Sequence, residues 1–138
     1  PSNPLVRGFD DRFFVPHSRH TGLNLKDLAA VPALRVLASG RRTGPFLLST
    51  ENGRQIFVTG HPEYDLFTLD AEYRRDLEKG LEISVPENYY PSDDPAQRPI
   101  NRWRSHAHLL YHNWLNYYVY QTTPYDLEEL SPLAGEPR

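Results

Sequence analysis

The chain lacks two residue types that most proteins of its size contain, cysteine and methionine. Without cysteine, these 138 residues exclude disulfide bonds, thiolate metal sites and a cysteine nucleophile of their own. Translation normally starts at methionine, so its absence leads us to expect a fragment, a processed piece or a trimmed version of a longer protein.

Long apolar runs and an excess of basic residues are also missing. No run of 18 apolar residues occurs, and the first residues, PSNPLVRGFDD, have neither the basic nor the apolar part of a signal peptide. We therefore expect a cytoplasmic protein without a membrane partner. The formal net charge of −3 gives no electrostatic reason to expect nucleic acid. A small molecule or another protein is the expected partner.

The residues that are present favour a folded domain. Two Trp, nine Tyr and six Phe supply more apolar area than a disordered, charge-rich chain carries. Strand-like and helix-like segments are mixed, which predicts a single α/β unit over residues 1–130. We expect the remaining segment, 131–138, to be a flexible tail.

Apolar segments bounded by turn-forming residues predict the strands. Residues 13–15 (Phe-Phe-Val) are expected to form a short strand, and residues 34–38 another. Segments 46–49 and 55–59 flank Asn52-Gly53, which predicts a hairpin with positive φ at both turn residues. If an edge of the sheet is left unpaired, we expect the rest of the sheet to come from elsewhere.

Helical spacing and end signals predict the helices. Residues 25–30 are expected to form one turn, and residues 68–79 a helix that stops at Gly80. Four prolines between residues 82 and 100 predict an ordered loop. Residues 101–120 are expected to form a long helix packed on the sheet. Its apolar face contains Trp103, Ala107, Leu110, Trp114 and Tyr117.

His61 and Glu63 directly follow the second hairpin segment, with only Pro62 between them. An imidazole with a carboxylate two residues later can form an oriented general base, because the carboxylate fixes the tautomer and stabilises the imidazolium. The spacing alone favours a structural turn histidine and leaves the general base as the alternative.

Three segments resemble a known family. PLVRGFDDRFFVPHSRHT, GRQIFVTGHPEYD and WRSHAHLLYHNWLNYYVYQTTPYDL closely resemble the C-terminal half of the homoserine O-acyltransferases, over residues 4–130. The resemblance implies half of a flavodoxin-like, doubly wound sheet, similar to class I glutamine amidotransferases. It also implies a ping-pong reaction of methionine biosynthesis, in which a cysteine takes an acyl group from acyl-CoA and passes it to the hydroxyl of L-homoserine.

The resemblance also assigns roles to four residues. His61 matches the family's general base, Glu63 its orienting carboxylate, and Ser18 the serine at its substrate site. Arg75 matches the arginine expected to hold the carboxylate of the amino acid, a task that suits a guanidinium fork. Ser18 could instead cap a turn, and Arg75, like its neighbour Arg74, could instead belong to a solvated ion-pair face.

The family's cysteine lies in the N-terminal half, so the implied partners include that half, together with L-homoserine and succinyl-CoA or acetyl-CoA. A homodimer is also expected, acyl-CoA acts as a co-substrate, and no cofactor is implied. Serine as the acceptor, or an inactive half that only assembles with an N-terminal partner, remain alternatives. His108 and His112 are spaced to share a metal, but no third ligand is evident, so no metal site is expected. His106 is expected to be packed, and His17 and His20 flank Ser18.

Overall fold

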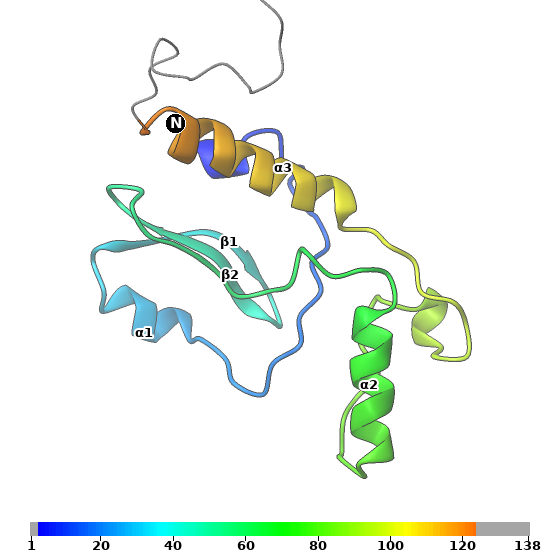
Figure 1. The fold of residues 1–138 in the computed structure, drawn as a ribbon. Coiled ribbons are helices and arrows are strands. Elements are labelled where there is room, and N and C mark those ends of the chain that lie inside the picture. Colours follow the sequence, from blue (N-terminus) through cyan, green and yellow to red (C-terminus); the bar gives the residue numbers. More distant parts are fainter. Residues whose placement is uncertain (1–2, 124–138) are drawn as a thin grey trace, which may run out of the picture.

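The computed structural model describes residues 3–123 and has α/β architecture: a small sheet, two longer helices and several short helical turns (Figure 1). In chain order the elements are η1 (Pro4–Val6), α1 (Leu25–Ala29), β1 (Leu34–Gly40), β2 (Gly44–Thr50), β3 (Ile56–Val58), α2 (Thr68–Glu78), η2 (Pro91–Asp93), α3 (Arg104–Trp114) and the π-helical segment η3 (Leu115–Tyr120). No helix in this part of the chain is long and apolar enough to span a membrane.

The sheet is antiparallel, in the order β1-β2-β3, and β3 is an edge strand. Leu47 pairs with Val58 and Ser49 with Ile56, which confirms the predicted hairpin. Of the two turn residues, however, only Gly53 has a positive φ, +69°, so the prediction for Asn52 was wrong. The Asn52 carboxamide instead accepts the backbone N–H of Arg54 at 3.1 Å, which closes the turn without a left-handed residue there.

The hydrophobic core is divided into two clusters. The first lies between β2 and α3 and is centred on Leu5, Phe46, Leu47 and Leu110. The second joins the start of α2 to the proline-containing loop and to the residue before α3. Its buried members are Leu69, Tyr89, Tyr90 and Trp103. The segment between β3 and α2 connects the two clusters, and His61 lies in it.

The helix α2 ends where the sequence predicts. Gly80 has φ +72°; its N–H bonds to the carbonyl of Leu77 at 2.9 Å, and the N–H of Leu81 bonds to that of Asp76 at 3.1 Å. This pair of bonds is the Schellman motif, which needs a left-handed residue after the helix and so favours glycine. The loop over residues 82–100 contains only the short turn η2, as its prolines predict.

Two predictions about the elements need correction. Residues 13–15 are not a strand; Phe13 and Val15 pack on the first cluster, so their apolar side chains reflect burial and not a ladder. The long helix starts at Arg104, and residues Leu115–Tyr120 are π-helical. Its predicted apolar face is only partly buried, since Trp114 is 42% exposed. The tail predicted at 131–138 lies outside the described residues.

Candidate functional site

His61 and Glu63 form a hydrogen-bonded pair just beyond β3. Nδ1 of His61 lies 2.9 Å from Oε1 of Glu63, and the two side chains are 34% and 53% exposed. The N–H of Tyr64 bonds to the carbonyl of His61 at 3.2 Å, so these residues form one tight turn around the buried Pro62. With Glu63 accepting the Nδ1 proton, the imidazole presents an unprotonated Nε2, which is the form required of a general base.

The loop that contains Ser18 is hydrogen-bonded to the segment that leads into the His61 turn. The carbonyl of Pro16 accepts the N–H of His61 at 2.8 Å, and the guanidinium of Arg19 donates to the carbonyl of Thr59 at 3.2 Å. Gly60 allows the close approach, because a Cβ there would lie 3.0 Å from Cε1 of His17. Ser18 therefore lies next to the His61 turn. Within residues 3–123 its side chain makes no hydrogen bond with either member of the pair.

His17, which packs against Gly60, is held in its neutral form. Burial, and after it the positive charges of Arg19 and His61, together lower the pKa of His17 to about 4. Its Nδ1 is buried and has no partner among the described residues. The neutral ring therefore adds no positive charge beside His61 at physiological pH.

Tyr64 connects the His61 turn to the helix α2. The Tyr64 ring is stacked on the His61 imidazole, with 4.3 Å between centroids and an interplanar angle of 15°. Its hydroxyl donates to Oε1 of Glu72, in α2, at 2.9 Å. Burial and this hydrogen bond raise the pKa of Tyr64 to about 12, so the phenol remains protonated throughout the range in which enzymes are assayed.

Arg75, in the next turn of α2, is paired with an acid of its own helix. Its Nε donates to Asp76 at 2.8 Å, while Arg74 bonds to Asp70. The pairing with Arg75 lowers the pKa of the Asp76 carboxyl, so this acid remains ionised. Arg74 and Arg75 therefore both form the ion pairs that are expected if they belong to a solvated ion-pair face. Within residues 3–123 the terminal nitrogens of Arg75 have no hydrogen-bond partner, and its side chain is 51% exposed.

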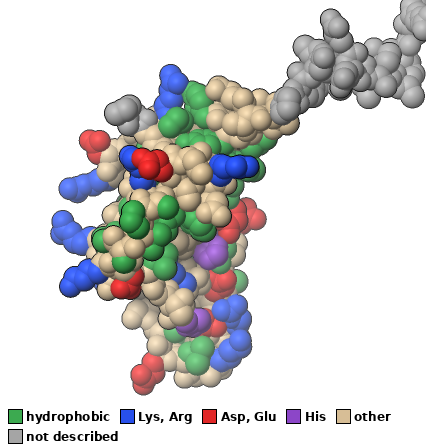
Figure 2. Space-filling view, turned by 90° about the vertical axis from the view of Figure 1, so that its left-hand side faces the viewer, with side chains coloured by type: hydrophobic (Ala, Val, Ile, Leu, Met, Phe, Trp, Pro, Cys, Tyr) green, Lys and Arg blue, Asp and Glu red, His purple; other side chains and the backbone are tan. Residues whose placement is uncertain are grey.

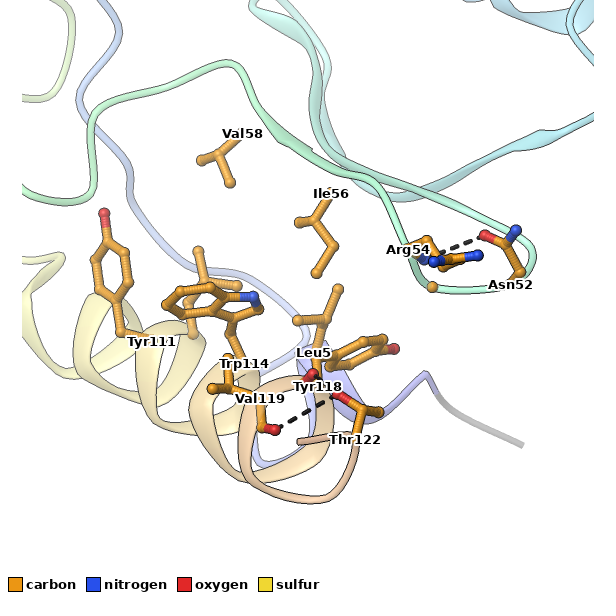
Figure 3. A pocket seen from close by; sticks show the side chains of 12 residues that line it. Leu5, Asn52, Arg54, Ile56, Val58, Tyr111, Trp114, Tyr118, Val119 and Thr122 are labelled. Atoms are coloured by element: carbon orange, nitrogen blue, oxygen red, sulfur yellow. Dashed lines mark hydrogen bonds between the residues drawn. The ribbon is translucent and has the colours of Figure 1, made fainter. Parts of the chain in front are cut away.

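An apolar groove of about 720 Å³ runs between β3 and the helix α3 with its extension η3 (Figure 3). Ile56 and Val58 lie on its sheet side, and Tyr111, Trp114 and Tyr118 point toward them from the helical side. It reaches Val58, the last residue of β3 and three residues before His61 along the chain, but neither His61 nor Glu63 lines it. On the face seen in Figure 2, exposed hydrophobic side chains lie between basic and acidic ones, and neither sign forms a stripe.

The other histidines do not assemble a metal site. Among the described residues there is no group of three or more His, Cys, Asp or Glu side chains that could hold a metal ion. His106 is packed, as expected, with its ring stacked 5.1 Å from that of Phe13. His108 and His112 are exposed on the outer side of α3.

Sequence reasoning missed Tyr64, Glu72 and Tyr111. The Tyr64–Glu72 hydrogen bond joins residues on either side of an irregular segment, so no helical or strand period marks it. Tyr111 lines the groove together with Val58, a placement that depends on how α3 crosses the sheet. The one local signal was Tyr64 itself, an aromatic residue directly after the His-Pro-Glu turn.

Known proteins match most of this chain. Residues 1–125 match the homoserine O-succinyltransferase family. The homoserine O-acetyltransferase of Desulfitobacterium hafniense is 60% identical over 126 residues, which cover 91% of this chain and 41% of that protein. The homoserine O-acetyltransferase of Petrotoga mobilis is 56% identical over 128 residues, or 93% of this chain, and that of Geobacillus kaustophilus is 58% identical over 124 residues, or 90%. The chain spans about 41% of the length of these relatives. By this match the chain belongs to the homoserine O-succinyltransferase family.

Proposed function

We propose that this chain supplies the general base and the acceptor-binding groups of an enzyme that transfers an acyl group from acyl-CoA to the hydroxyl of L-homoserine, a step of methionine biosynthesis. The observation that carries the proposal is the His61–Glu63 pair, joined at 2.9 Å and open to solvent at the end of β3. The names of the relatives supply the reaction and the acceptor.

His61 would act in both halves of a ping-pong reaction. It first takes the proton of a cysteine thiol, whose sulfur attacks the thioester carbonyl of acyl-CoA; the CoA thiolate leaves and receives that proton. His61 then takes the proton of the homoserine hydroxyl, whose oxygen attacks the acyl-enzyme thioester; the cysteine thiolate leaves and is reprotonated. Glu63 stabilises the imidazolium that forms each time.

Ser18 and Arg75 would position the acceptor. The side chain of Arg75 is half-exposed, and its terminal nitrogens have no hydrogen-bond partner within residues 3–123, so they can form two parallel hydrogen bonds with the homoserine carboxylate. The Pro16 and Arg19 bonds hold Ser18 beside the His61 turn. Acetyl-CoA and succinyl-CoA both remain candidate donors: the relatives are named acetyltransferases, and the family bears the name of the succinyl reaction.

The nucleophile must come from outside these 138 residues, which contain no cysteine. We propose that the nucleophile-bearing part of the enzyme packs into the groove beside β3, where it completes a flavodoxin-like sheet. Three features support this occupant. Within residues 3–123 the outer edge of β3 is unpaired, the groove is lined mainly by apolar side chains, and it reaches Val58, three residues before His61 along the chain. In addition, more than half of each relative's length lies outside the match.

A chimeric enzyme tests the proposal. In the D. hafniense acetyltransferase, the 126 matched residues would be replaced by those of this chain. We expect the chimera to transfer acetyl or succinyl groups to homoserine in preference to serine, and we expect His61→Ala to abolish transfer while circular dichroism stays unchanged. An active His61→Ala chimera would remove His61 from the mechanism. The isolated chain should show no transfer.

A further inference from the structure

The geometry around His61 points to a second side chain that controls it: we propose that Tyr64, anchored by Glu72, is a positioning residue that fixes the plane of the His61 imidazole. This inference rests on the proposed function, since it assigns Tyr64 a role in the chemistry of His61. It concerns a residue that touches neither substrate in the proposed mechanism.

The turn itself places the two rings face to face. The hydrogen bond from the Tyr64 N–H to the His61 carbonyl folds residue 64 back over residue 61. The rings lie 4.3 Å apart and are tilted by only 15°. Glu63 holds the edge of the imidazole through Nδ1, and Tyr64 covers its face. The two contacts constrain different rotations of the same ring.

Glu63 alone does not fix the plane of the imidazole. Its hydrogen bond to Nδ1 sets the tautomer but holds the ring at one edge only, and the Glu63 side chain is 53% exposed, so solvent screens the ion-pair contribution. A general base must keep its nitrogen within hydrogen-bond reach of the proton that it removes. An error of about 1 Å in such a placement can lower a rate by about 100-fold. A second contact on His61 is therefore functionally significant.

Tyr64 can act as this contact because it is anchored at both ends. Its hydroxyl donates to Oε1 of Glu72 at 2.9 Å, and its carbonyl accepts the indole N–H of Trp103 at 3.0 Å. Oε2 of Glu72 is buried and has no partner within residues 3–123, so the hydrogen bond from Tyr64 to Oε1 is the one that this carboxylate makes there. Since the Tyr64 phenol stays protonated, its anchor persists at any assay pH.

The same anchor connects the base to the acceptor site. Glu72 and Arg75 lie in adjacent turns of α2, so the hydrogen bond from Tyr64 ties the helix that carries Arg75 to the turn that carries His61. Loosening it would let the base and the bound amino acid move independently.

The test uses matched hydroxyl deletions in the chimeric enzyme. Tyr64→Phe keeps the ring and removes the anchor. Tyr90→Phe removes a comparable bond, because the Tyr90 hydroxyl donates to Asp70, also in α2, at 2.6 Å, without touching His61. We expect Tyr64→Phe to lower kcat about 10-fold, with the KM for acyl-CoA unchanged, and Tyr90→Phe to lower it less than about two-fold. Tyr64→Leu, which also removes the stacked ring, should lower it about 100-fold.

The two half-reactions separate positioning from the alternatives. Because His61 acts in both, Tyr64→Phe should slow CoA release in the absence of homoserine by the same factor as overall transfer. If Tyr64→Phe slows only the transfer to homoserine, Tyr64 is a substrate contact. If Tyr64→Phe and Tyr90→Phe lower kcat equally, the role of Tyr64 is structural. Either result overturns the inference. Glu72→Gln, which preserves a hydrogen-bond acceptor, should retain most activity, whereas Glu72→Ala should match Tyr64→Phe. The proposed function fails separately, if His61→Ala retains activity.

Discussion

Replacing Glu63 by glutamine is the sharpest test of the proposed base, because it removes the charge and leaves the size of the side chain unchanged. In the present structure the carboxylate can only accept a hydrogen bond, so it accepts the proton on Nδ1 of His61. A carboxamide can also donate through its NH₂ group, which favours the opposite tautomer. In that tautomer Nε2 carries the proton and cannot act as a base.

The expected loss follows from the geometry. A hydrogen bond to a charged group is worth about 1.5–3 kcal/mol, against about 1 kcal/mol for a neutral one, so losing the charge at 2.9 Å costs about 0.5–2 kcal/mol. The unfavourable tautomer adds about 1 kcal/mol. Because the Glu63 side chain is 53% exposed, we do not add a larger Coulomb contribution. A total of about 1.5–3 kcal/mol predicts a fall in kcat of about 10- to 150-fold.

The assay is the release of CoA by the chimeric enzyme, with and without homoserine. Both the acylation and the transfer step should slow, since the same imidazole acts in each. Glu51→Gln is a suitable control, because Glu51 is an exposed carboxylate paired with Arg35 on the hairpin, away from His61. A loss below about three-fold for Glu63→Gln, equal to that of the control, would refute the assignment of Glu63 as the orienting group.

Three further predictions test the rest of the proposal, the first two in the chimera and the third with the two parts expressed as separate chains. Arg75→Leu should raise the KM for homoserine about 10- to 100-fold and leave CoA release without homoserine intact, whereas Arg74→Leu should change neither; equal effects would show that both belong only to the ion-pair surface. Asn113→Ala should lower the free energy of unfolding in urea by about 2–4 kcal/mol, because it leaves two backbone carbonyls without their donor, and a change below about 0.5 kcal/mol would contradict this. Val58→Asp places a charge in the groove, so it should prevent this chain from co-purifying with the unmatched part of the D. hafniense protein. Phe57→Asp lies on the other face of β3 and should not prevent it. If both variants still bind, the groove is not the docking surface.

Elements whose signals are local could be predicted from the sequence. The hairpin follows from Asn52-Gly53 between two apolar segments, and the end of α2 follows from Gly80. The His61–Glu63 bond belongs to the same class, because only one residue separates the partners. In each case the residues that decide the structure lie within a few positions of one another, so the pattern contains most of the required information.

Features that depend on distant contacts could not be predicted. Residues 13–15 have strand composition, yet Phe13 and Val15 pack on the first cluster, and no strand within residues 3–123 pairs with this segment. Asn113 looks like a polar interruption of the helix. It is in fact buried, with its amide donating to the carbonyls of Leu5 at 3.1 Å and Arg7 at 2.8 Å, more than 100 residues away. The roles proposed for Ser18 and Arg75 could not be predicted from local patterns either, and depend on the resemblance to the family. The structure shows only which groups surround these two residues.

Because the contacts that orient His61 are local, they can form before another segment of the protein supplies a nucleophile. The strand end, the turn, the Glu63 carboxylate and the Tyr64 ring are encoded in nearby residues of one segment, so the His61 imidazole is oriented by contacts within its own turn. What the turn cannot fix is its position relative to the acceptor helix, and the Tyr64–Glu72 bond supplies that contact. A cysteine delivered through the groove beside β3 would then meet a base whose tautomer and plane are already set. Such preorganisation matters because an interaction that forms only after docking would spend binding free energy on ordering the ring.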